Sequence, residues 1–131
     1  MDMPLADQKG FLVDSYGNEQ FSRDVIARFP TLRGDLERNA DLLHPQMDTL
    51  AQALRQRVQS GDTHFPMRIC SFLDEALRKP KAISEIGNAV AISFVEACEL
   101  RKTPTGKAVL RMMPTSVRSI LLEQERRGGA Q

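Results

Sequence analysis

Apolar residues along this chain recur mostly three and four positions apart, which is the spacing of an amphipathic α-helix. The sustained alternation typical of a strand is not seen, and Val, Ile, Tyr and Thr do not cluster. Seven prolines interrupt the pattern, and a proline usually stops a helix or occupies its first turn. The pattern therefore predicts an all-α fold. The expected helices cover about residues 18–29, 31–42, 45–59, 64–79, 84–101, 107–113 and 114–126.

Local signals refine these helices. Pro45 suits the first position of its helix, where the missing N–H is no loss. Gly34 weakens the helix over 31–42, because glycine costs a helix interior about 1 kcal/mol relative to alanine. Residues 84–101 are rich in Gly, Ala and Ser, so we expect a slim, central and deeply buried helix there. Residues 102–106, Lys-Thr-Pro-Thr-Gly, form the clearest predicted loop.

A chain of 131 residues is expected to form one domain. We expect a loose N-terminal segment at 1–15, a single helical domain at 16–127 and a disordered tail at 128–131. The favoured architecture is an irregular bundle of six to seven short helices. Short helix pairs stacked as in a HEAT-like solenoid are the alternative.

Composition narrows the function classes. The net charge of +1 argues against a dedicated nucleic-acid binder, and no apolar run approaches the roughly 18 residues of a membrane span. No Gly-rich phosphate loop occurs, and His44 and His64 lack the spacing of a zinc site, so neither metal nor cofactor is expected. The acidic N-terminus does not resemble a secretory signal. Together with two cysteines, Cys70 and Cys98, expected to be reduced and buried, this predicts a cytoplasmic protein.

The near-neutral charge hides an uneven distribution. Residues 1–50 hold nine acidic and five basic side chains, whereas residues 51–131 hold eight acidic and thirteen basic ones. Two basic groups lie at predicted helix turns: Arg78, Lys79 and Lys81, and then Arg101, Lys102, Lys107 and Arg111. Cations at helix C-termini on a solvated face explain them, and binding of an acidic protein or of nucleic acid is the alternative. No aromatic residue is interleaved with them, which disfavours stacking of single-stranded bases.

Four acidic residues form a second group: Asp74 and Glu75 on one predicted helix, Glu96 and Glu99 on the next. If these helices pack antiparallel, the carboxylates line one rim. Structural pairing with arginine is the favoured interpretation, and Arg68, seven residues before Glu75, is the expected neighbour. Two other interpretations of these carboxylates are a rim that binds a partner and a site for acid–base chemistry.

Several segments between residues 29 and 100 carry a resemblance. They are Phe-Pro at 29–30, Leu-His-Pro at 43–45, Ile-x-Ser-Phe-Leu-Asp-Glu-Ala-Leu at 69–77 and Asn-Ala-Val-Ala-Ile-Ser-Phe-Val-Glu at 88–96. The chain here resembles a family of small bacterial all-helical domains of uncharacterised function, in which Val usually stands at the position of Ile92. These motifs concern packing and identify no chemistry. Such domains are similar in kind to immunity proteins of polymorphic toxin systems, so the resemblance implies a toxin-neutralising protein.

We therefore expect a non-enzymatic module that binds another protein, in particular a cognate toxin domain, and that needs no membrane. The candidate partner-binding residues are Asp74, Glu75, Glu96, Glu99, Arg78, Lys79 and Lys81. One alternative is a small enzyme whose site is assembled from Glu75, Glu96, His64 and Cys70. The other is a helical nucleic-acid-associated module that uses the basic turns. The sequence carries no signal for an oligomeric state.

Overall fold

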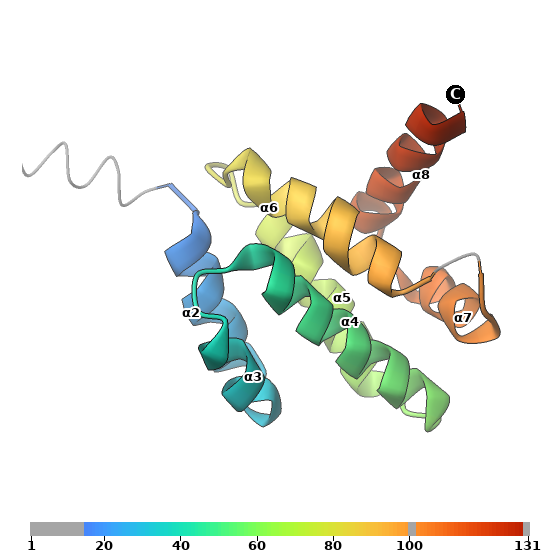
Figure 1. The fold of residues 1–131 in the computed structure, drawn as a ribbon, viewed down its shortest axis with the longest axis horizontal. Coiled ribbons are helices and arrows are strands. Elements are labelled where there is room, and N and C mark those ends of the chain that lie inside the picture. The colour runs from blue at the N-terminus through green and yellow to red at the C-terminus, as the bar shows by residue number, and fades with distance from the viewer. Residues whose placement is uncertain (1–14, 100–101, 130–131) are drawn as a thin grey trace, which may run out of the picture.

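The computed structural model describes residues 15–99 and 102–129, and Figure 1 shows that this part of the chain is built from helices. The α-helices are α2 (Asn18–Arg28), α3 (Arg33–Arg38), α4 (Leu43–Gln59), α5 (His64–Leu77), α6 (Ser84–Ala89), α7 (Pro104–Met112) and α8 (Thr115–Gly129). A 3-10 turn, η1 (Pro30–Leu32), precedes α3, and a π-helical segment, η2 (Val90–Val95), continues α6. Within the described ranges the β structure is limited to one isolated bridge, between Tyr16 and Ala82. The predicted all-α fold is confirmed.

The sequence also predicts loose ends of the chain and no membrane-spanning segment. The predicted loose segment at 1–15 lies outside the described residues except for Ser15, and residues 130–131 of the predicted tail also lie outside them. Among the helices that the structure describes, none combines the length and the apolar character needed to cross a bilayer.

Three predicted boundaries need correction. The helix expected over 31–42 is the turn η1 followed by the short α3, and the chain leaves helical geometry before Asp41, whose φ is +65°. The helix expected to start at Pro45 begins at Leu43. The loop expected at 102–106 is largely the first turn of α7, because the Thr103 side chain accepts the backbone N–H of Gly106 at 2.9 Å and Pro104 follows as the first helical residue.

Helices α4, α5 and the continuous α6–η2 unit form the centre of the molecule. Helix α4 packs against both α5 and η2, and α2 and α3 cover its N-terminal end (Figure 1). Helix α8 packs on α5 and η2, and its C-terminal part projects beyond the other helices (Figure 1). The predicted burial of the slim helix holds for Ile86, Ala89, Val90 and Phe94, which are all fully buried.

An aromatic cluster joins α2 to α5. The Phe72 ring lies 5.4 Å from that of Phe21 and 5.6 Å from that of Phe29, and Phe29 also packs on Phe65 at 5.7 Å. All four rings are buried, and tilted or edge-on pairs of this kind add about 0.5–1.5 kcal/mol each beyond their burial. The α2–α5 junction is therefore a rigid part of the fold.

One buried polar link ties α2, α3 and α4 together. The Gln46 side-chain amide on α4 donates to Ser22 Oγ at 2.8 Å and to the Leu36 carbonyl at 3.3 Å. The same Ser22 oxygen accepts the backbone N–H of Asp41 at 3.2 Å. Because donors shielded from water are costly to leave without an acceptor, this serine oxygen supports the turn between α3 and α4 as well as α4 itself.

Candidate functional site

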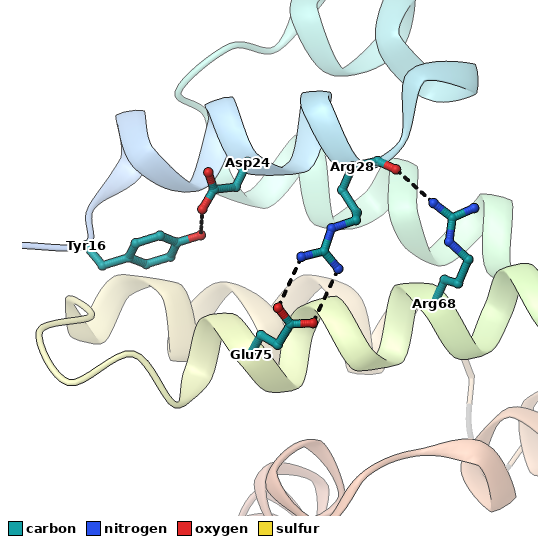
Figure 2. A network of polar contacts seen from close by, with 5 residues as sticks. All are labelled: Tyr16, Asp24, Arg28, Arg68 and Glu75. Atoms are coloured by element: carbon teal, nitrogen blue, oxygen red, sulfur yellow. Dashed lines mark hydrogen bonds and ion pairs between the residues drawn. The ribbon is translucent and has the colours of Figure 1, made fainter.

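A network of polar side chains spans the junction of α2 and α5 (Figure 2). Arg28, the last residue of α2, donates from Nη1 and Nη2 to the two carboxylate oxygens of Glu75 on α5, at 3.3 and 3.1 Å. Arg68, also on α5, donates from Nη2 to the Arg28 carbonyl oxygen at 3.1 Å. At the other end of α2, the Tyr16 hydroxyl donates to Asp24 Oδ2 at 2.8 Å.

The Arg28–Glu75 pair is two-pronged but solvent-accessible. The hydrogen bonds from Arg28 hold the pKa of the Glu75 carboxyl below its usual range, and Glu75 in turn raises the pKa of Arg28. The side chains are 40% and 53% exposed, so water screens the pair and its net worth is about 0–1 kcal/mol. Its main effect is to fix the orientation of the Arg28 guanidinium group.

Aromatic rings at and beside the α2–α5 junction lie under four cations. Four cations, here called the cationic face, each lie over a ring: Arg28 over Phe72, Arg57 over Phe65, Arg68 over Phe29 and Phe65, and Lys79 over Tyr16. The distances to the ring centroids run from 4.4 to 5.9 Å, within the range of cation–π attraction. Because the rings are buried, these cations lie directly over the edge of the core.

Two shallow hollows open on the same surface. One, of about 540 Å³, is lined by Asp24, Ala27, Arg28, Pro30 and Arg68. The other, of about 350 Å³, is lined by Tyr16, Lys79, Pro80 and Lys81. Both hollows are wide open to solvent.

The structure separates the four candidate carboxylates. Glu75 faces α2, whereas its neighbour Asp74 accepts a hydrogen bond from Ser116 Oγ on α8 at 2.6 Å and pairs with Arg78 at 3.3 Å. Glu99 pairs with Arg55 on α4 at 3.0 Å, and Glu96 is exposed after η2. The expected single rim is therefore not formed, because the three paired carboxylates face three different helices.

The expected pairing of Glu75 with an arginine is found, with a different partner. Arg68 lies two helical turns away, about 10.5 Å along the α5 axis, and turns toward the end of α2 instead. The arginine that pairs with Glu75 is Arg28, which lies 47 positions away in the sequence. Short-range spacing carries no signal for such a contact, so neither Arg28 nor Asp24 was a candidate.

The remaining candidates lie apart. Lys79 belongs to the cationic face, and Lys81 lines the smaller hollow beside it. His64 and Glu75 are eleven residues apart on α5, about 16 Å along its axis. Cys70 is buried, and burial raises the pKa of its thiol to about 12.

The second basic group lies on and beside α7. Lys102, Lys107 and Arg111 are exposed beside or on α7, and Arg101 is outside the described ranges. Within those ranges no group of three His, Cys, Asp or Glu side chains is placed to hold a metal ion.

Comparison with known proteins identifies one family. The model described as "Domain of unknown function (DUF7674)" matches residues 23–127. No curated protein and no solved structure matches the chain. The matched range contains the segments between residues 29 and 100 that carry the resemblance noted above. It also contains α5 and the part of α2 that holds Asp24 and Arg28.

Proposed function

The chain belongs to the family described as a domain of unknown function (DUF7674), and we propose that it is a non-enzymatic protein-binding module. Its specific role in this proposal is that of a cytoplasmic immunity protein, which neutralises a cognate bacterial toxin by direct binding. The observation that carries the proposal is the cationic face, where four cations are held over buried rings on a shallow surface.

Arginines held in this way suit a protein interface. Arg is enriched at interfaces and among the residues that dominate binding energy. Long side chains normally lose freedom on binding, at about 0.5–1.5 kcal/mol each, and stacking on the rings reduces that loss. Because Arg28 and Arg57 are already paired with carboxylates, the attraction of the face for an acidic partner rests mainly on Arg68 and Lys79. Opposite charge also accelerates association.

The test starts from the open reading frame next to the gene of this protein. We expect its product to be toxic when expressed alone and harmless when this chain is co-expressed. A neighbour that is harmless alone, or that stays toxic in the presence of the wild-type chain, contradicts the immunity role.

A pair of double variants locates the binding face. Arg57→Gln with Arg68→Gln removes two charges from the cationic face, and Lys107→Gln with Arg111→Gln removes two from exposed positions on α7. We expect the first variant to lose protection and the second to retain it. The opposite result assigns binding to the basic residues of α7. Tight DNA binding at low salt that the α7 variant abolishes supports the nucleic-acid alternative instead.

A further inference from the structure

Arg68 differs from the other arginines of the cationic face in its partners. Arg28 pairs with Glu75 and Arg57 pairs with Asp62, both at 3.1 Å. Within the described ranges, Arg68 contacts no carboxylate, and its hydrogen bond goes to the Arg28 carbonyl. It is therefore a charged donor group whose ionic partner is not supplied by the described part of the chain.

Arg68 is an exposed residue, and contacts with the end of α2 and with two rings orient its guanidinium group. The Arg28 carbonyl lies at the C-terminal end of α2, where carbonyl groups lack helical partners, and one amino group of Arg68 satisfies it. The rings of Phe29 and Phe65 hold the guanidinium at 5.6 and 5.9 Å. Figure 2 shows the second amino group directed away from Arg28. A guanidinium group has five N–H donors in a planar fork, so donors remain for a carboxylate.

The larger hollow provides space beside these donors. It is about 540 Å³ in volume, and Ala27 and Pro30 contribute apolar surface against which the methylene groups of an acidic side chain can pack. Asp24 also lines this hollow, and Glu75 forms an ion pair with Arg28, another lining residue. These two carboxylates repel a polyanion such as nucleic acid more than a single carboxylate, which favours an isolated Asp or Glu side chain.

We propose that Arg68 and this hollow form the anchor site for an Asp or Glu side chain of the partner protein. That the partner is a protein rests on the proposed function. That the group bound is a carboxylate rests on the geometry of Arg68. Arg68 contributes the charge and the planar donors, and the end of α2 together with two rings keeps them in place before binding.

A random 12-residue peptide library, panned against the wild-type chain with the Arg68→Gln variant as counter-target, tests the carboxylate site. We expect the selected peptides to be enriched in Asp and Glu. Replacing one acidic residue by its amide is expected to weaken binding about tenfold or more in fluorescence anisotropy, as is Arg68→Gln. Arg68→Lys keeps the charge without the fork and is expected to give an intermediate loss. Arg111→Gln is expected to change affinity less than about twofold.

Three results overturn the inference: no acidic enrichment, equal binding to the Arg68→Gln variant, or displacement of the peptides by a 12-nucleotide single strand at a lower concentration than by free acidic peptide. Circular dichroism and the melting temperature of each variant distinguish a lost contact from a lost fold. The toxin assay separates the two proposals. If the wild-type chain and the Arg68→Gln variant protect equally, the anchor site is wrong and the immunity role stands. If the wild-type chain gives no protection, the immunity role fails while the peptide result still decides the carboxylate site.

Discussion

Adding one methyl group at Gly106 tests how α7 is attached to the rest of the fold. A Cβ at this position would lie 1.9 Å from the Glu99 carbonyl oxygen, 2.6 Å from its carbon and 2.8 Å from the Cys98 carbonyl oxygen. Ordinary contact begins at 3.4 Å, so the two backbones would have to separate by about 1.5 Å. Glu99 resists this movement, since its carboxylate is paired with Arg55 and its φ is +50°.

The expected cost of Gly106→Ala follows from two opposing effects. Overpacking typically costs about 1–3 kcal/mol, and the upper end of this range applies here because the obstacle is backbone, which cannot rotate away. Alanine recovers at most about 1 kcal/mol through its better helix propensity. We therefore expect a net loss of about 2 kcal/mol in the free energy of unfolding, a large share of the roughly 5–15 kcal/mol of a typical domain.

Gly34→Ala is the matched control, because nothing lies within 4 Å of a Cβ built on this exposed residue of α3. The same chemical change should stabilise the protein there by about 0.4–1 kcal/mol. Urea unfolding followed by circular dichroism at the helical band measures both values. A Gly106→Ala variant as stable as the wild type would refute the close packing of α7 on the turn at Cys98 and Glu99.

Three further predictions concern the core and the polar network. Ser22→Ala removes the acceptor of one buried Gln46 N–H and of the partly buried Asp41 backbone N–H, and should lower the free energy of unfolding by about 1–3 kcal/mol in the same urea assay; an unchanged value contradicts the buried link. Glu75→Gln should cost less than about 1 kcal/mol at pH 7. Because Arg28 lowers the folded-state pKa of Glu75, the wild-type advantage is present above the unfolded pKa and lost as the pH falls through the folded value; a difference that grows with acidity contradicts the pair. The thiols of Cys70 and Cys98, whose pKa values burial raises, should resist iodoacetamide at pH 8 and react in urea, and rapid labelling of the native chain would show that they are accessible.

The sequence predicts helices well wherever an apolar stripe is long enough to be buried on one face. On α5, for example, Phe65, Ile69 and Phe72 are spaced four and three positions apart, and all three are buried. Predictions fail where local signals compete. Thr103 and Pro104 resemble loop residues next to a glycine, yet they are a cap and a first helical residue, and Gly106 serves a close backbone approach instead of a turn.

The candidate site was predictable only in part. Glu75 could be selected because its position on a helix rim is set by a local period. Arg28 could not, because the contact that gives it a role depends on how α2 docks on α5. The rings of Phe29 and Phe65 belong to the core, and their contacts with Arg57 and Arg68 form only when separate helices are brought together.

The proposal is tested most directly by the association rate of the purified chain with the product of the open reading frame next to its gene, measured at several salt concentrations. We predict rapid, salt-sensitive association for the wild type and for the Lys107→Gln, Arg111→Gln variant. For the Arg57→Gln, Arg68→Gln variant we predict a rate about tenfold lower and a weaker dependence on salt. A face variant that associates at the wild-type rate, or a wild-type chain that does not bind at all, would contradict the account.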